Sequence, residues 1–271
     1  MVAAAFLFSV MASGVQRAAE QVPNTVVVFF RNAVALALLA PFILRGGRAA
    51  LSTRRFGEHV IRTAAGLGSM YCFFFAVAHL RLADAVLLNY TLPLFIPFIE
   101  WLWLGQPLEP RLFPPIALGF AGVILVLRPG AGLFQSASLV GLCAGLLSAL
   151  AQTGVRRMTT TEPAMRIVFY FSLLSTLASA APLPAAWVTP GPGLLILLVA
   201  TGACAAAGQL LMTRAYAYAP AAQVGAFIYS AVPFSIALDW IRHHRLPGLA
   251  SWLGAACICA AGGVMLRLGR R

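Results

Sequence analysis

Charged side chains are scarce in this chain. Of its 271 residues only 10% are charged, none is lysine, and 61% are hydrophobic. A soluble domain of this length would need a larger polar surface to remain dispersed in water. The shortage of charge therefore excludes a soluble globular protein and predicts a polytopic membrane protein.

Metal-binding and redox motifs are missing as well. The five cysteines lie inside apolar segments, and Cys257 and Cys259, two residues apart, point to nearly opposite sides of a helix. No other spacing suits a metal or a redox pair. His79 and Asp84 are the nearest approach to a catalytic pair, but no second histidine joins them. We therefore expect no metal, no cofactor and no catalytic residue, and the chain is not expected to be an enzyme.

A single basic patch is also absent, although the formal net charge is +12. The arginines are spread between apolar segments, which is typical of a membrane protein and does not indicate nucleic-acid binding. No basic region precedes the first apolar segment and no cleavage site follows it, so a signal peptide is not expected. Residues 2–16 follow Met1 directly. Either this helix crosses a thin region with little tilt, or the true start lies upstream of Met1.

Long apolar segments dominate what is present. Ten of them follow one another, and most reach the roughly 20 residues that a spanning helix needs. We expect them near residues 2–16, 24–44, 58–80, 83–104, 110–128, 138–155, 164–185, 192–213, 221–241 and 248–268. The predicted fold class is an all-α polytopic membrane protein with ten transmembrane helices.

The two halves of the chain echo each other at an offset of 139 or 140 residues. The matching pairs are Gly14 and Gly154, Arg17 and Arg157, Pro23 and Pro163, Phe29 and Phe169, Gly68 and Gly208, Tyr90 and Tyr229, Pro93 and Pro233, Glu100 and Asp239, and Trp101 and Trp240. We predict two five-helix repeats, residues 1–130 and 138–271. Because five is odd, the second repeat enters the membrane from the opposite side, which gives the inverted-topology repeat of many secondary transporters.

Counting arginines predicts the orientation. With a cytoplasmic N-terminus, thirteen arginines lie on the cytoplasmic side, five lie on the other side, and Arg31 lies inside the membrane. The thirteen are Arg45, Arg48, Arg54, Arg55, Arg62, Arg111, Arg156, Arg157, Arg166, Arg214, Arg267, Arg270 and Arg271. Because cytoplasmic loops carry the excess of basic residues, we predict cytoplasmic termini in a bacterial inner membrane.

Both repeats contain a helix interrupted by proline, built on TLPLF in the first and AVPFS in the second. An acid–Trp pair, a polar turn and a Gly-rich helix (119–127 and 254–266) follow each unit. These units, with the segment PNTVVVFFRNAVALALLAP, resemble the drug/metabolite transporter superfamily and, within it, the ten-helix family with two EamA domains. The chain departs from the family at Gly105-Gln106, where Gly-Glu is frequent, and has His244-Arg245 in the second turn. The resemblance covers essentially the whole chain and implies a transporter of amino acids, nucleobases, drugs or other metabolites.

Polar residues inside the apolar segments are the candidate binding residues, since each is costly in hydrocarbon without a partner. At roughly 100° per residue, Asn89, Pro93 and Glu100 fall within about 40° of one another on one helix. We predict that the helices break at Pro93 and Pro233 and that residues near the breaks line a substrate cavity. The predicted substrate-binding residues are Asn89, Tyr90, Tyr71, Phe75, Gln209 and Tyr229. The alternative is hydrogen bonding between helices for Asn89 and Tyr90, and simple packing for the aromatic residues.

Three charged residues lie in or near the spans. Glu100 and Asp239 either carry protons or anchor the helix ends, and their neighbouring tryptophans favour anchoring. Arg31 either binds an anionic group of a substrate or fixes packing through Asp84 or a backbone carbonyl, and the resemblance favours packing. Because the substrate-binding set contains no charged residue, it predicts a neutral or amphipathic substrate.

The expected function is a secondary transporter, most simply an exporter of small organic metabolites (amino acids or related compounds) or drugs, working by alternating access. Its partners are the small-molecule substrate, the lipid bilayer, and either a proton or a counter-substrate, with no role for nucleic acid. The alternative is a channel or a lipid scramblase on the same helical frame. Saturation and counterflow in proteoliposomes separate these classes.

Overall fold

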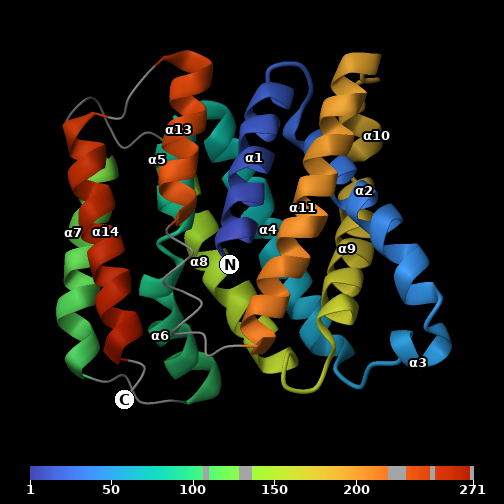
Figure 1. Cartoon of the computed structure of the whole chain (residues 1–271), viewed down its shortest axis with the longest axis horizontal. Coiled ribbons are helices and arrows are strands. Elements are labelled where there is room, and N and C mark those ends of the chain that lie inside the picture. The colour runs from blue at the N-terminus through green and yellow to red at the C-terminus, as the bar shows by residue number, and fades with distance from the viewer. Residues whose placement is uncertain (106–109, 128–135, 219–229, 245–247, 269–271) are drawn as a thin grey trace.

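The computed structural model describes residues 1–105, 110–127, 136–218, 230–244 and 248–268, and the regular structure within these ranges is helical. The helices of the first half are α1 (Val2–Ala18), α2 (Asn24–Leu44), α3 (Gly47–Leu51), α4 (Phe56–His79), α5 (Leu82–Asn89), α6 (Leu92–Leu104), the 3-10 turn η1 (Pro110–Leu112) and α7 (Phe113–Leu127). Those of the second half are α8 (Ser136–Met158), α9 (Ala164–Ala180), α10 (Leu183–Ala186), α11 (Pro192–Tyr218), α13 (Ala231–His243) and α14 (Leu249–Leu268). Apart from short connecting pieces such as α3, they stand side by side (Figure 1).

Five helical stretches are long and apolar enough to cross a bilayer: Asn24–Leu44, Phe56–His79, Leu82–Trp103, Ser136–Met158 and Pro192–Ala217. Shorter apolar helices accompany them at Val2–Ala18, Pro110–Leu125, Ala164–Ala180 and Leu249–Val264. Large apolar side chains cover the outer faces, with Leu102 82%, Ile196 71% and Leu249 77% exposed. Such faces fit lipid and would be costly in water. The predicted fold class, an all-α polytopic membrane protein, is confirmed.

The span expected at residues 83–104 consists of two helices. α5 ends at Asn89, and α6 begins at Leu92 with Pro93 in its first turn. Proline has no N–H to donate to the carbonyl four residues earlier, and its ring crowds that carbonyl, so a continuous helix is disfavoured here. In the second half, Pro233 likewise lies in the first turn of α13, and residues 219–229 fall outside the described ranges.

Helix contacts repeat between the two halves. α4 packs on α8 as α11 packs on α1, α6 packs on α8 as α13 packs on α1, and α2 packs on α11 as α9 packs on α4. α2 meets its own equivalent α9, and α7 meets α14. In Figure 1, α6 leads to the lower end of the molecule and α13 to the upper end, and α1 and α8 also run in opposite directions. The two halves are therefore inverted repeats.

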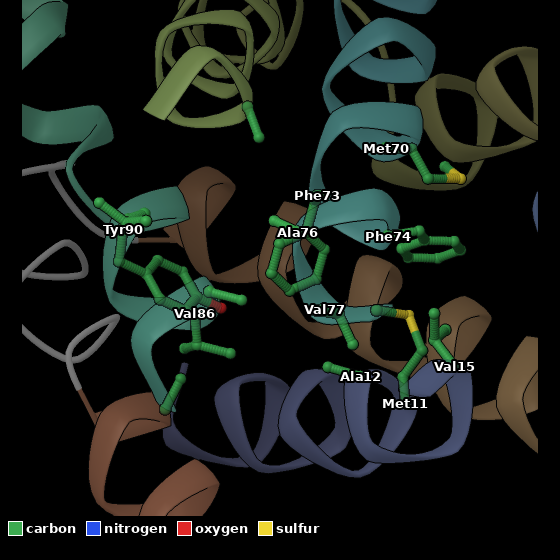
Figure 2. Packing of buried hydrophobic residues seen from close by; sticks show 14 of the residues in the cluster. Met11, Ala12, Val15, Met70, Phe73, Phe74, Ala76, Val77, Val86 and Tyr90 are labelled. Carbon is green, nitrogen blue, oxygen red and sulfur yellow. The ribbon is translucent and has the colours of Figure 1, made fainter. Parts of the chain in front are cut away.

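The apolar core lies where α1, α4 and α5 meet. Figure 2 shows Ala12 and Val15 of α1 beside Val77 of α4, and Phe73 of α4 facing Tyr90, which follows the end of α5. Val15 and Val77 are 1% and 0% exposed. This cluster fills the space between the C-terminal ends of α1 and α4. Phe73, Phe74 and Tyr90 of this cluster also line a cavity.

Close approach of α8 to the helix break depends on glycine. A Cβ added to Gly145 would lie 2.5 Å from Thr91 Oγ1 and 2.7 Å from the carbonyl oxygen of Leu88. Thr91 Oγ1 itself donates to that carbonyl at 2.7 Å. Small residues allow helix backbones to meet closely in membranes. α8 thus supports the broken span at the point where its backbone is irregular.

Candidate functional site

A cavity of about 130 Å³ lies at the centre of the molecule. Its walls come from both repeats: α1, α2, α4, α5 and α6 of the first, and α8, α9 and α11 of the second. Irregular backbone at the junction of α5 and α6 contributes Tyr90. Non-helical backbone inside a membrane protein is tolerated where it is buried or lines a cavity. The cavity therefore lies between the two repeats, beside the break in the α5–α6 span.

Asn89, the last residue of α5, lines this cavity and is held by a hydroxyl network. Ser148 Oγ donates to Asn89 Oδ1 at 3.0 Å and lies 2.7 Å from Ser69 Oγ. Ser69 Oγ in turn donates to the carbonyl oxygen of Ala144 at 2.9 Å. Each serine hydroxyl has one hydrogen, so the two hydrogens cannot fill all three contacts at once. Asn89 thus both faces the cavity and joins α5 to α8.

Two arginines line the cavity and share one aromatic ring. Arg31 of α2 and Arg62 of α4 are only 4% and 3% exposed. Their Cζ atoms lie 5.5 Å and 4.0 Å from the centroid of the Phe171 ring in α9. Arg31 Nη1 donates to Asn32 Oδ1 at 2.7 Å. Arg31 Nε, Arg62 Nε and Arg62 Nη1 are buried without a hydrogen-bond acceptor. Both guanidinium groups therefore retain unused donors.

Acidic side chains in the described part of the chain stay outside the cavity lining. Glu100 accepts from Arg156 at 2.7 Å, and Glu20 accepts from Arg242 at 2.7 Å. Glu58 pairs with arginines at one end of α4, and Glu162 pairs with Arg166 at the start of α9. The lining is therefore positively charged.

The remaining polar lining is neutral and comes from both repeats. Gln152 Nε2 of α8 donates to Met212 Sδ at 3.3 Å, and Gln152 Oε1 is buried without a donor. Gln209 of α11, a predicted binding residue, also lines the cavity. The amide groups offer both donors and acceptors to a bound molecule. Within the described residues, no group of three or more His, Cys, Asp or Glu side chains could hold a metal ion.

Two predicted binding residues, Tyr71 and Phe75, lie elsewhere on α4 and do not line the cavity. At about 100° per residue they are roughly 180° and 220° around the helix from Arg62. Phe75 stacks on His79 at a centroid distance of 4.1 Å, and the carbonyl oxygen of Tyr71 accepts from Asn24 Nδ2 at 3.0 Å. Tyr229 lies outside the described residues.

Glu100 and Asp239 lie at opposite ends of the molecule and each joins two helices. The Glu100–Arg156 pair links α6 to α8. Asp239 is 6% exposed, and its Oδ2 accepts from the backbone N–H of Ala83 at 3.1 Å. That N–H belongs to the first turn of α5, where it has no partner within the helix. These contacts favour the anchoring role for both acids.

Arg62 is the main cavity residue that sequence reasoning missed, because it was counted among the cytoplasmic arginines. A periodic signal was available. Gly66, Ser69, Met70 and Phe73 follow Arg62 at intervals of 4, 7, 8 and 11 residues and all line the cavity. These intervals define one face of a helix. The stripe places Arg62 inside the span, on the face that meets Phe171.

Known proteins that this chain is similar to are transporters. The pseudopaline exporter of Pseudomonas aeruginosa is 28% identical over 96% of this chain and 92% of its own length. A riboflavin transporter of Brucella anthropi is 27% identical, over 91% and 89%. An S-adenosylmethionine uptake transporter of Rickettsia bellii is 22% identical, over 87% and 81%.

The fold and the sequence pattern agree with these likenesses. A solved crystal structure matches with a TM-score of 0.66 at 19% identity, over 99% of this chain and 98% of that chain, which shows a common fold. The pattern of the EamA-like transporter family matches residues 1–128 and 135–267, nearly the whole chain. The protein therefore belongs to the EamA-like transporter family.

Proposed function

We propose that this transporter is a secondary exporter of small organic metabolites, such as amino acids or related compounds, or of drugs, and that it works by alternating access. The observation that carries the proposal is the central cavity, which is lined by both inverted repeats and by the broken span at Asn89 and Tyr90. Substrate sites of inverted-repeat transporters lie at this position. The repeats are taken as residues 1–130 and 138–271.

Two ion pairs at opposite ends suit an alternating cycle. Glu100–Arg156 joins α6 to α8, and Glu20 joins Arg242 of α13 to the end of α1. The helix pairs α6–α8 and α13–α1 are equivalent under the repeat. Both pairs are formed in this structure, and opening one end would break the pair there at a cost of only about 1 kcal/mol or less, because these ion pairs are partly exposed. Rocking of one repeat against the other is the usual form of such a cycle.

The direction and the membrane orientation are part of the proposal, which two observations address. The excess of arginine on one side predicts cytoplasmic termini in the inner membrane. A reporter fused after Arg271 should therefore report a cytoplasmic location. Among the similar proteins, the pseudopaline exporter supports export, while the S-adenosylmethionine transporter is named for uptake.

The experiment that tests the proposal is transport by the purified full chain in proteoliposomes loaded with pooled labelled metabolites. We expect saturable efflux of one or a few compounds, with counterflow when unlabelled compound is added on the other side. A channel or a scramblase would give neither saturation nor counterflow. Empty liposomes and liposomes with heat-denatured protein provide the controls.

A further inference from the structure

We propose that Arg31 and Arg62 together bind the anionic group of the substrate, and that the transported compounds are small organic carboxylates. This inference rests on the proposed function as a transporter and names the substrate class of the same cavity. It refines the expectation of a neutral or amphipathic substrate, which followed from a residue set without charge.

The two arginines are buried without a counter-charge among the described cavity residues. Arg31 and Arg62 are only 4% and 3% exposed, and none of the described acidic side chains lines the cavity beside them. A buried charge is strongly unfavourable unless it is paired and hydrogen-bonded. The Phe171 ring face attracts both cations, but it cannot accept the in-plane N–H groups. The pair is therefore incomplete without an acceptor that carries negative charge.

The two arginines also have N–H donors without acceptors. Three guanidinium nitrogens lack acceptors: Arg31 Nε, Arg62 Nε and Arg62 Nη1. A carboxylate has two oxygens that accept in a plane, which matches the planar fork of a guanidinium. Both side chains line the same cavity, so their free donors are within reach of a molecule bound there. An arginine that served only to pack α2 against α9 would need no cavity beside it.

The other cavity residues indicate the body of the molecule that carries the carboxylate. Phe8, Phe73, Phe74 and Met70 supply an apolar wall, and Gln152 Oε1 supplies an acceptor without a donor. A compound with an apolar body and one N–H or O–H group would fill these positions. Two guanidinium groups have enough charge and donors for a phosphate ester as well, so the choice of a carboxylate rests on the planar match of its two oxygens to the guanidinium fork. We therefore assign the site to a carboxylate.

A head-group series tests the assignment even while the natural substrate is unidentified. The probes share a body and differ in one group: phenylacetate, phenylacetamide and phenethylamine; hexanoate, hexanamide and hexylamine; and phenyl phosphate. Thermal stabilisation of the purified full chain in detergent measures binding of each probe. We expect at least one carboxylate to stabilise the protein, while its amide and amine partners do not. Equal stabilisation by acid and amide, no stabilisation by either carboxylate, or stabilisation by phenyl phosphate alone would overturn the assignment.

Variants then locate the effect. Arg31→Gln and Arg62→Gln keep a polar but shorter side chain and remove the charge, and we expect carboxylate binding to weaken by roughly tenfold or more. Arg214→Gln is the matched control, because Arg214 is exposed on α11 and does not line the cavity. Unchanged carboxylate binding in both cavity variants would contradict the inference. Proteoliposome efflux by the wild type is measured separately, and its absence would contradict the proposed function. Efflux with unchanged selectivity in both variants would contradict only the carboxylate site.

Discussion

The two repeats use one helical frame but place different chemistry on it. Arg31 in α2 is equivalent to Phe171 in α9, and these two side chains meet in the structure. Arg62 in α4 is equivalent to Gly202 in α11. An added Cβ on Gly202 would lie 2.6 Å from Val34 Cβ, so α11 packs directly on α2 where α4 leaves space for a guanidinium. The repeat fixes the positions of the helices, and its departures from symmetry create one charged cavity.

Placing the arginine of the first repeat at the equivalent glycine of the second should prevent correct folding. We predict that Gly202→Arg lowers the yield of folded protein by about tenfold or more, because it forces a long charged side chain into a packed interface. Size-exclusion chromatography of the detergent extract measures the yield. Gly263→Ala is the control, since nothing lies within 4 Å of its added Cβ. Equal yields of Gly202→Arg and the control would show that the two interfaces are not packed differently.

The support of the helix break offers a second comparison. Gly145 of α8 is equivalent to Ala5 of α1, which is already buried at 1% exposure. We predict that Gly145→Ala destabilises the protein by about 1–3 kcal/mol through overpacking against Thr91 and Leu88. Ala5→Gly should cost about 1 kcal/mol or less, mainly through helix propensity. Thermal denaturation in detergent compares the two, and a larger loss for Ala5→Gly would contradict the account.

Substitution of Glu100 and of Asp239 compares the two ends of the molecule. We predict that Glu100→Gln lowers stability by about 1 kcal/mol or less, because its partner Arg156 is 41% exposed. Asp239→Asn should cost more, since a buried backbone N–H of α5 loses a charged acceptor. Transport per folded molecule should stay within about twofold of the wild type in both variants. Loss of pH-driven transport at normal protein levels would instead make the altered acid a proton carrier.

The turn before α9 reverses the pattern, because here the second repeat carries the charge. Glu162 occupies the position of Val22 and accepts from Thr53 Oγ1 and Arg166 Nη1 at 2.8 Å and 2.7 Å. Burial alone would raise the pKa of Glu162, but these hydrogen bonds hold it below the ordinary value of 4.5. Ionised Glu162 therefore stabilises the fold above about pH 4.5, and this contribution is lost as the pH falls through the lowered pKa.

Thermal melts across pH test that contribution. We predict that Glu162→Gln melts below the wild type by a few degrees at pH 7 and that the gap narrows as the pH falls below 4.5. Val22→Ala, at the equivalent position, should lower the melting temperature by an amount that does not change with pH. A gap for Glu162→Gln that is constant from pH 7 to pH 4 would contradict the lowered pKa.

The sequence predicts the frame well because the frame follows from hydropathy, repetition and proline chemistry. Segment lengths predict the spans, the 139- or 140-residue echo predicts the inverted repeat, and Pro93 coincides with the division into α5 and α6. The cavity is harder to predict because it depends on how each helix is rotated. Both faces of α4 are rich in apolar and aromatic side chains, so the periodicity that groups Arg62 with Gly66 and Phe73 does not show that this face lines the cavity and the face of Tyr71 does not. The meeting of Arg31 with its own repeat equivalent, Phe171, depends on the packing of α2 against α9.

Access to the cavity from the two sides of the membrane tests the central claim most directly. Ser148 lines the cavity, so Ser148→Cys, in a chain whose five native cysteines are replaced by alanine, places a single thiol there. Oriented proteoliposomes are treated with a membrane-impermeant maleimide, added either outside or inside. Alternating access predicts labelling from both sides, with each reaction slowed by the compound that undergoes efflux. Labelling from one side only, at a rate that this compound does not change, would contradict alternating access through the cavity between the repeats.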